Sequence, residues 1–274
     1  MNQEDLMIVN VIGVGKVSSS IARQLKGKVQ FGYIVSRDLE KAKVLSRELG
    51  ALAVTYSDNF VLNGVVLVGL NDSSLLSLPH LLEKNMDYIS KETVFIHFSG
   101  FHSSNIFPID WNSVSMHPNC AVANEFKTFE DVVFGIEGTS RGIEIAKKLV
   151  GLLNGKYVLI DTEKKAMYHL AAVVASNFPI ALAYLSLLMY KEIGIGEDIS
   201  KEIVCKLFES VSKNIKSNTL KDALTGPVKR NDWDIIEQEK SIFEEFVNSQ
   251  GLSCIALYND SVNLLLKIVN DHKY

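Results

Sequence analysis

The fold of this chain is decided by one segment near its start, Asn10-Val11-Ile12-Gly13-Val14-Gly15-Lys16-Val17-Ser18. The residues that lead into the glycines, 6–12, are an apolar run rich in Ile and Val, which is typical of a buried parallel strand. The residues that follow, 21–25, indicate the first helix. A strand, a glycine turn and a helix in this order open a dinucleotide-binding βαβ unit.

The glycine turn is suited to bind a pyrophosphate. Gly13 allows the chain to turn tightly, and Gly15 lets the backbone come close to the phosphates. The helix that follows presents free N–H groups and a partial positive charge to that anion. Ser18 replaces the third glycine of the usual pattern. We predict cofactor contacts from Gly13, Val14, Gly15, Lys16, Val17 and Ser18.

The end of the second predicted strand, residues 30–35, favours NADP(H) over NAD(H). NAD-binding folds usually carry an acidic residue about 20 residues past the glycines, where it binds the ribose 2′-hydroxyl. Here Ser36 and Arg37 take that place, and they can bind a 2′-phosphate that a carboxylate would repel. One hydrogen bond to a charged group contributes about 1.5–3 kcal/mol. The alternative is that Arg37 is an ordinary surface residue.

Two later strands, residues 65–70 and 93–98, end at the same edge of the predicted sheet. In an open parallel sheet, ligands bind outside the carboxyl ends of the strands. We therefore predict further cofactor contacts from Leu70, Asn71, Asp72, Ser99 and Gly100. The alternative for the first of these loops is that Asp72 or Ser73 caps a helix over residues 75–83.

The order of the predicted elements gives the domain organisation. Strands and helices alternate over residues 1–160, which predicts an α/β fold with a Rossmann-type doubly wound parallel sheet and bound NADP(H). Helical periodicity alone continues over residues 161–274, which predicts a helical domain for substrate binding and dimerisation. The helices of that domain are predicted over 162–190, 197–217, 232–248 and 252–270. We expect the active site in the cleft between the two domains.

The composition excludes several classes of protein. The 274 residues carry a net charge of −4 and show no basic stripe, which excludes a nucleic-acid partner. Cys120, Cys205 and Cys254 are far apart, so they form neither a metal-binding spacing nor a disulfide framework. Residues 1–5 are too polar for a signal peptide. We expect a cytoplasmic protein without a metal.

One apolar segment, residues 170–189, is long enough to cross a bilayer. It contains Ser176, Asn177 and Pro179, and it follows a nucleotide-binding fold. A helix that is hydrophobic all round can also be the buried centre of a protein or a dimer interface. We therefore expect a buried helix in a homodimer that has no contact with a membrane.

Polar residues interrupt the start of this long helix. His169 and Ser176 are seven residues apart and share a face, with Asn177 beside them. Buried polar groups need partners, and a polar substrate is one possible partner. His169 could donate a proton near neutral pH, and Asn177 could hold a carboxylate or a hydroxyl. The alternative is a core histidine and asparagine that are bonded within the protein.

A second polar group lies between two predicted helices, in residues 223–232. It combines the Thr225 hydroxyl, a Gly-Pro turn and two cations, Lys229 and Arg230. The cations could bind an acidic substrate, Arg230 in a bidentate way. The alternative is a solvated linker in which Asp232 caps the next helix.

Four motifs together resemble a known family, and they span nearly the whole chain. They are His97-Phe98-Ser99-Gly100, His117-Pro118, the run from Tyr168-His169 to Ser176-Asn177, and Leu224-Thr225-Gly226-Pro227. These motifs resemble Rossmann-like oxidoreductases with a helical C-terminal domain of the DUF2520 type, which are similar to pyrroline-5-carboxylate reductases and ketopantoate reductases. The chain looks most like the non-classical class of ketopantoate reductases. This resemblance implies NADPH-dependent reduction of 2-dehydropantoate to pantoate in pantothenate and coenzyme A biosynthesis.

The resemblance also implies roles for particular residues. His169 falls at the position of the catalytic lysine of classical ketopantoate reductases, and Asn177 falls at that of their second helix asparagine. Val173 stands where those enzymes have their first asparagine. Residues 116–119 resemble the Met-Pro-Asn segment that lies near the nicotinamide in pyrroline-5-carboxylate reductases, which implies a cofactor contact from Pro118. The implied catalytic residues are His169 and Asn177, and the implied substrate-binding residues are His117, Ser176, Thr225 and Arg230.

Two other functions stay open. An imine reductase that acts on pyrroline-5-carboxylate or a similar cyclic imine would use the same fold and cofactor. A non-catalytic module that senses NADP(H) would bind the cofactor without turnover of a keto acid.

Overall fold

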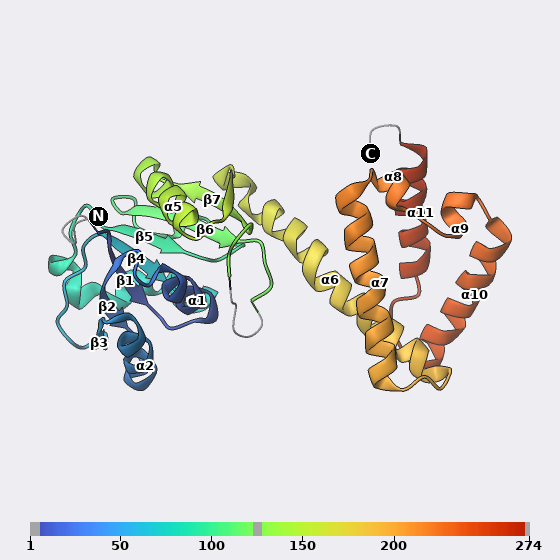
Figure 1. The fold of residues 1–274 in the computed structure, drawn as a ribbon, viewed down its shortest axis with the longest axis horizontal. Coiled ribbons are helices and arrows are strands. Elements are labelled where there is room, and N and C mark those ends of the chain that lie inside the picture. The colour runs from blue at the N-terminus through green and yellow to red at the C-terminus, as the bar shows by residue number, and fades with distance from the viewer. Residues whose placement is uncertain (1–5, 123–127, 272–274) are drawn as a thin grey trace. The chain divides into compact units, whose positions relative to one another are not determined.

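The computed structural model describes residues 6–122 and 128–271 as two compact units, one ending at Asn177 and the next beginning at Phe178. The first unit contains one sheet with the strand order β3-β2-β1-β4-β5-β6-β7-β8 (Figure 1). Its strands are β1 (Ile8–Ile12), β2 (Gln30–Val35), β3 (Leu52–Val54), β4 (Val65–Val68), β5 (Val94–His97), β6 (Asn112–Pro118), β7 (Val133–Gly138) and β8 (Lys156–Leu159). This arrangement confirms the predicted Rossmann-type α/β fold.

The sheet is parallel except at one pair of strands. β6 and β7 are antiparallel, with Met116 opposite Ile136. A parallel return needs a crossover segment, usually a helix. The described part of the connection between these strands contains no helix. The predicted doubly wound parallel sheet therefore contains one antiparallel pair of strands.

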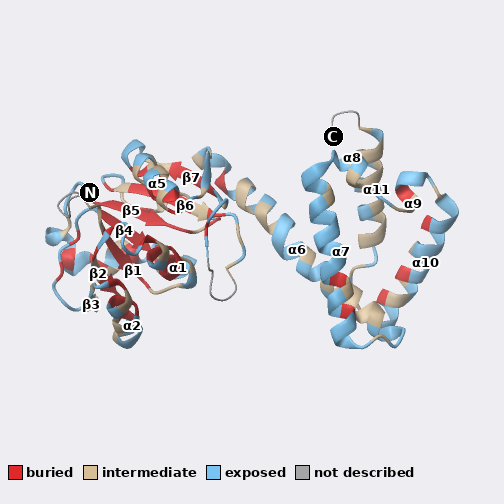
Figure 2. Cartoon of the chain, in the orientation of Figure 1, coloured by how far each residue is buried: buried red, intermediate tan, exposed pale blue. Residues whose placement is uncertain are grey.

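Helices cover both faces of the sheet. The helices of this unit are α1 (Lys16–Leu25), α2 (Leu39–Leu49), α3 (Asp72–Leu76), α4 (Leu78–Leu81) and α5 (Ser140–Leu152). One apolar cluster joins α1, α2 and α5 to the β1 side chains Val9 and Val11. A second cluster joins α3 and α4 to Ile12, on the opposite face. The alternation along β1 thus supplies both halves of the core, where most buried residues lie (Figure 2).

The loop after β4 differs from its prediction. The helix predicted over residues 75–83 is divided into α3, α4 and a 3₁₀ turn, Glu83–Tyr88. Pro79 lacks an N–H and cannot continue the helical hydrogen bonds through this point. Asn71 caps α3, because its Oδ1 accepts a hydrogen bond of 2.9 Å from the Ser74 N–H. The prediction of Asp72 or Ser73 as the cap is therefore wrong.

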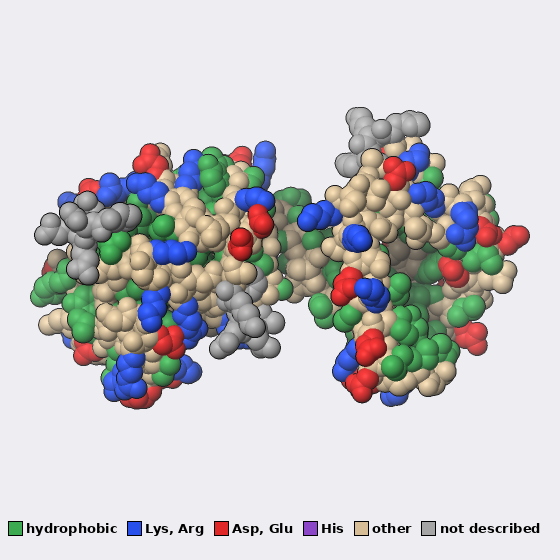
Figure 3. Space-filling model, in the orientation of Figure 1, with side chains coloured by type: hydrophobic (Ala, Val, Ile, Leu, Met, Phe, Trp, Pro, Cys, Tyr) green, Lys and Arg blue, Asp and Glu red, His purple; other side chains and the backbone are tan. Residues whose placement is uncertain are grey.

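The second unit is helical, as predicted. Its helices, with the long helix that enters it, are α6 (Lys165–Glu192), α7 (Glu197–Ser217), α8 (Leu220–Ala223), α9 (Pro227–Arg230), α10 (Trp233–Ser249) and α11 (Leu257–Asn270). The last helix begins at Leu257 rather than at 252, because the chain first turns at Gly251, which has a φ of 64°. Few residues of this unit are buried (Figure 2), and apolar side chains gather on its surface (Figure 3).

The long apolar helix is exposed in the single chain. The segment Thr162–Glu192 is long and apolar enough to cross a membrane, yet only 6% of its most apolar window is buried. Lys165 is the one buried residue of α6. The chain's own core therefore does not bury this helix as we expected, and the dimer-interface alternative stays a prediction. The two units divide inside α6, later than the predicted boundary at 160, because the first turns of α6 pack on the sheet.

Candidate functional site

The glycine turn between β1 and α1 is closed against the loop after β4. Gly13 has a φ of 82°, and a Cβ at Gly13 or at Gly15 would lie 2.7 Å from the Gly69 carbonyl oxygen. Only glycine fits at these close approaches. No side-chain hydrogen bond caps the N-terminus of α1 at Gly15, where the positive end of the helix dipole lies. The turn therefore fits the pyrophosphate of a dinucleotide.

Ser18 supports this turn from inside. Its side chain is buried, and its Oγ lies 3.0 Å from the Gly13 oxygen and 3.1 Å from the Gly15 oxygen. A Cβ on Gly69 would overlap the Ser18 hydroxyl. Ser18 thus holds the turn in shape through its hydroxyl, which explains why serine can replace the third glycine of the pattern. Leu70 also packs on the turn, against Gly13.

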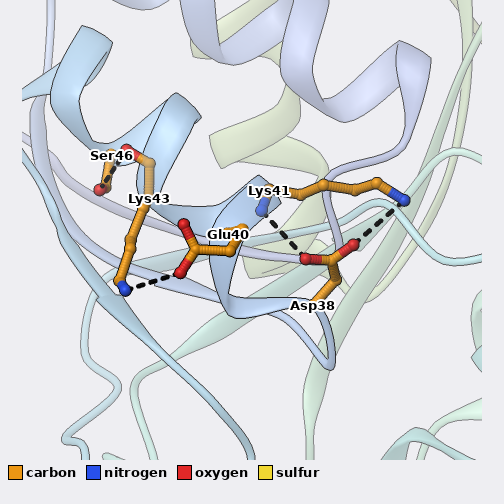
Figure 4. Close-up of polar contacts among 5 residues, drawn as sticks. All are labelled: Asp38, Glu40, Lys41, Lys43 and Ser46. Carbon is orange, nitrogen blue, oxygen red and sulfur yellow. Dashed lines mark hydrogen bonds and ion pairs between the residues drawn. The ribbon is translucent and has the colours of Figure 1, made fainter.

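Two cations follow β2, Arg37 in the loop and Lys41 in the first turn of α2. The end of β2 adjoins the glycine turn, since the Gly13 N–H donates to the Val35 oxygen at 2.8 Å. Arg37 is exposed. Asp38 caps α2 by accepting from the Lys41 N–H at 3.1 Å, and Lys41 Nζ lies 3.2 Å from the same carboxylate (Figure 4). This hydrogen bond and the nearby Lys41 charge lower the pKa of Asp38. The sequence analysis missed Lys41, although its place in the first turn after the strand was a usable signal.

Two hydroxyl groups, those of Ser36 and Tyr56, also lie near the end of β2. Ser36 is buried, and its Oγ accepts from the Asp38 N–H at 3.1 Å. Tyr56 Oη is buried and has no hydrogen-bond partner among the described residues. Burial raises the pKa of Tyr56 to about 12, against the opposing charge of Arg37. Cations and hydroxyls therefore gather at the end of β2, which is chemistry that suits a phosphate.

A cluster of aromatic rings lies at the carboxyl ends of β5 and β6. A Cβ on Gly100 would overlap His169 Nδ1 and would lie 2.9 Å from His117 Nε2. The two imidazole rings are nearly perpendicular, with centroids 5.9 Å apart. His169 Nδ1 is buried without a hydrogen-bond partner among the described residues. The structure thus brings together three predicted site residues from β6, α6 and the loop after β5.

Tyr168 completes this cluster, although the sequence analysis gave it no role of its own. Its Oη lies 3.1 Å from His117 Nδ1. The same hydroxyl packs on Gly135 of β7, where a Cβ would overlap it. Burial raises the pKa of Tyr168, while the Asn119 side chain and the Gly135 N–H oppose this effect. The pKa of His117 is lowered to about 4, first by burial and then by the charges of Lys165 and His169. His117 is therefore neutral at pH 7.

His97 is a structural residue beside this cluster. It is fully buried at the end of β5, and burial lowers its pKa to about 3. Its Nδ1 accepts from the Ser99 N–H at 3.3 Å. Ser99 and the buried Pro118 border the cluster through their backbone.

Two predicted residues of α6 have a different environment from the one we expected. Ser176 and Asn177 are exposed. Ser176 Oγ lies 2.7 Å from the Ala172 oxygen and 2.9 Å from Asn177 Oδ1. The premise that these are buried polar groups without partners is therefore wrong, because they bond to their own helix and to each other.

The remaining predicted residues belong to the helical unit. Thr225 and Arg230 are exposed, on either side of Gly226, which has a φ of 93°. Lys229 Nζ donates to the Asp222 carbonyl oxygen at 3.2 Å. Asp232 precedes α10 but makes no side-chain cap there. A role of Thr225 and Arg230 in substrate binding stays a prediction. Across the described ranges, no group of three or more His, Cys, Asp or Glu side chains could hold a metal ion.

The chain is similar to several known proteins. A family model described as a domain of unknown function, DUF2520, matches residues 132–256. The crystal structure of protein TM1727 from Thermotoga maritima is 34% identical in sequence, with a TM-score of 0.80 over 97% of this chain and all of that chain. BF3122 from Bacteroides fragilis, for which an NADP oxidoreductase function has been suggested, is 20% identical, with a TM-score of 0.73 over 97% of this chain and all of its own.

More distant structures share the fold alone. The 1-pyrroline-5-carboxylate reductase of Streptococcus pyogenes is 16% identical, with a TM-score of 0.62 over 97% of this chain and 99% of its own. No curated protein matches the chain in sequence. The similarity to TM1727 covers both the sheet and the helical unit, so the two units occur together in both proteins.

Proposed function

The chain belongs to the same family as protein TM1727 of Thermotoga maritima, and from this premise we propose that it is an NADP(H)-dependent reductase. The observation that carries the proposal is the glycine turn, which only glycine can form against Gly69 and which leads directly into the N-terminus of α1. A 1-pyrroline-5-carboxylate reductase and an imine reductase in complex with NAD+ share this fold, although their sequence identity is low.

The choice of NADP(H) rests on the loop after β2. Arg37 and Lys41 place two positive charges beside the glycine turn, and Ser36 adds a hydroxyl. The carboxylate of Asp38 caps α2 and pairs with Lys41, so it does not take the ribose-binding role of an NAD enzyme. A 2′-phosphate is the group that this loop would recognise.

The proposed chemistry is the reduction of a carbonyl or an imine. NADPH, when bound, supplies the hydride. His169 then protonates the substrate oxygen or nitrogen. Its Nδ1 is buried against Gly100, so Nε2 is the nitrogen left to face a substrate. Asn177, Thr225 and Arg230 hold the carboxylate and hydroxyl of the substrate, as the family resemblance implies.

The proposed substrate is 2-dehydropantoate, which would be reduced to pantoate. The motifs that resemble non-classical ketopantoate reductases support this choice. An imine substrate is the second candidate, because a pyrroline-5-carboxylate reductase and an imine reductase from Bacillus cereus share the fold. In either case we propose a cytoplasmic homodimer with a small acidic substrate and no nucleic-acid or membrane partner. The exposed apolar length of α6 supports the dimer.

Oxidation of NADPH by purified protein tests this proposal. With 2-dehydropantoate we expect the nicotinamide absorbance to fall quickly, and with NADH we expect a much slower change. Pyrroline-5-carboxylate is the control substrate. If it were turned over faster than 2-dehydropantoate, the proposed substrate would be an imine and not the keto acid. Tight NADPH binding without turnover of either compound would overturn 2-dehydropantoate as the substrate, and it would move the function to another keto acid or imine, or to the sensing module.

A further inference from the structure

Two polar side chains that face each other across β6 and β7 are both buried. Ser115 of β6 lies opposite Glu137 of β7 in the antiparallel register, and their exposed fractions are 0% and 1%. Side chains at opposite positions of an antiparallel pair lie on the same face of the sheet, with their Cβ atoms about 5 Å apart. A buried carboxylate is rare unless it is well bonded. The hydrogen bonds of this cross-strand pair therefore show what it holds.

Ser115 connects the loop after β5 to the first turn of α6. Its Oγ accepts a hydrogen bond of 2.7 Å from Lys165 Nζ and donates to the Ser99 carbonyl oxygen at 3.2 Å. Lys165 is 1% exposed and is the one buried residue of α6, so its ammonium lies against the sheet and not in solvent. The backbone just before Gly100 is thereby bonded, through Ser115, to the start of the helix.

Glu137 makes a second connection between the same two segments. Its Oε1 accepts from the Ser104 N–H at 2.8 Å, and its Oε2 accepts from Ser104 Oγ at 2.9 Å. The same Oε2 accepts from Thr162 Oγ1 at 3.1 Å, in the 3₁₀ turn Thr162–Lys164 that leads into α6. Ser104 opens the 3₁₀ turn Ser104–Ile106, which has no side-chain cap from its own N-cap residue. The Glu137 carboxylate takes the place of that cap.

The two connections enclose the segments that carry the ring cluster. They hold the loop after β5 at both ends, Ser99 and Ser104, with Gly100 between them. They hold α6 at its beginning, and His169 follows one turn after Lys165. A Cβ on Gly100 would overlap His169 Nδ1, so the loop and the helix meet without spare room. A shift of either segment would therefore move His169 away from this contact or press it into the loop.

We propose that Glu137 and Ser115 are positioning residues that fix His169 against Gly100, because they bond the loop after β5 and the start of α6 to one place on the sheet. Both side chains are buried, so they act through His169 and not on a substrate. Two bonded points on each segment fix its direction as well as its distance. A catalytic group needs such support, since displacements of about 1 Å lower rates strongly. The importance of this pair for catalysis rests on the proposed function, but its effect on the His169 ring does not.

The test removes one connection while the shape of the side chain is kept. Thr162→Val deletes the hydroxyl that donates to Glu137 and leaves a β-branched residue of similar volume. The matched control is Thr93→Val, just before β5, where a buried hydroxyl donates to the Leu62 oxygen at the same distance of 3.1 Å. Each change removes one threonine hydrogen bond, so each should lower the midpoint of urea denaturation. A purely structural role of Thr162 would therefore give the same results as the control.

NMR of the histidine ring nitrogens, assigned with His169→Ala, reports on the ring cluster without any turnover. In Thr162→Val we expect the His169 ring signals to shift, because the start of α6 loses its bond to β7. Ser115→Ala removes the other connection and should shift them as well, whereas Thr93→Val should keep the wild-type signals. Wild-type His169 signals in folded Thr162→Val and Ser115→Ala would overturn the proposal. An equal shift in Thr93→Val would also overturn it, because the effect would then be a general loss of stability.

Turnover is the second readout. In Thr162→Val we expect kcat for the reduction of 2-dehydropantoate to fall about tenfold, because His169 is displaced. Thr93→Val should keep the wild-type kcat. Shifted His169 signals with an unchanged kcat would support the positioning by Glu137 and Ser115, and they would count against His169 as the catalytic residue of the proposed function.

Discussion

At the residue scale, the glycine turn depends on neighbours in the sequence, whereas the ring cluster depends on contacts between distant segments. The roles of Gly13 and Gly15 follow from a local pattern of strand, turn and helix. The contact of His117 with His169 joins β6 to α6 and depends on how those elements pack. Lys165 was missed for a related reason, because a lysine in sequence indicates a solvated side chain and only the tertiary structure shows that it is buried.

Gly100 offers a direct test of the ring cluster. In Gly100→Ala the new Cβ would displace His169 and press on His117. We expect turnover to fall by about a hundredfold, since small displacements of catalytic groups have effects of this size. The matched control is Gly151→Ala on α5, where an added Cβ meets no atom within 4 Å. If Gly100→Ala and Gly151→Ala had equal turnover, His169 would have no role in catalysis.

The two cations of the β2 loop allow a test of cofactor choice. Arg37→Ala and Lys41→Ala should each weaken NADPH binding about tenfold or more and leave NADH binding nearly unchanged, because each removes a charged hydrogen bond to the 2′-phosphate. Fluorescence titration with both cofactors measures this difference. Lys43→Ala is the control, since Lys43 pairs with Glu40 at 2.8 Å on the same helix (Figure 4). A loss of both cofactors in Lys41→Ala would indicate damage to α2 instead.

At the element scale, a helix boundary can be predicted from the sequence where a capping residue marks it. The helix α2 begins after its cap Asp38 and ends at Gly50, which has a φ of 71°. Asp before a helix and Gly after it are common sequence signals of the two helix ends. The direction of β7 carries no such signal, because strand direction depends on the connection and on pairing with β6.

The cap of α3 is a case where three neighbouring residues could each have served. Asn71→Ala should lower the free energy of unfolding by about 1 kcal/mol, because it removes the acceptor of the Ser74 N–H. Urea denaturation measures the change. Asp72→Asn keeps a similar shape and should have a smaller effect, since Asp72 is not the cap. If Asp72→Asn lowered the free energy of unfolding more than Asn71→Ala did, the cap would be Asp72 and not Asn71.

At the scale of the whole molecule, the two units differ in how well the single chain buries its apolar residues. The sheet has two continuous apolar clusters, one on each face. The helical unit instead exposes large apolar side chains, including Ile180 and Tyr184 of α6. A groove of about 580 Å³ between α6 and α10 is also lined mainly by apolar residues, such as Met189 and Phe246. The sequence correctly predicts that α6 is apolar. It does not show which protein surface packs against this helix.

A second copy of the chain is the partner that we propose for this surface. Light scattering should give a mass of twice 30.4 kDa for the wild-type protein. Ile180 and Tyr184 are 71% and 59% exposed, so replacing both with Glu should not disturb the folded chain. It should shift the protein toward the monomer, because each large apolar side chain contributes about 1.5–3 kcal/mol when it is buried. Val44→Glu on α2, at a site 54% exposed, is the control and should leave the dimer intact. A monomeric wild-type protein, or a dimer that survives both changes on α6, would show that this face of the helix is not the interface.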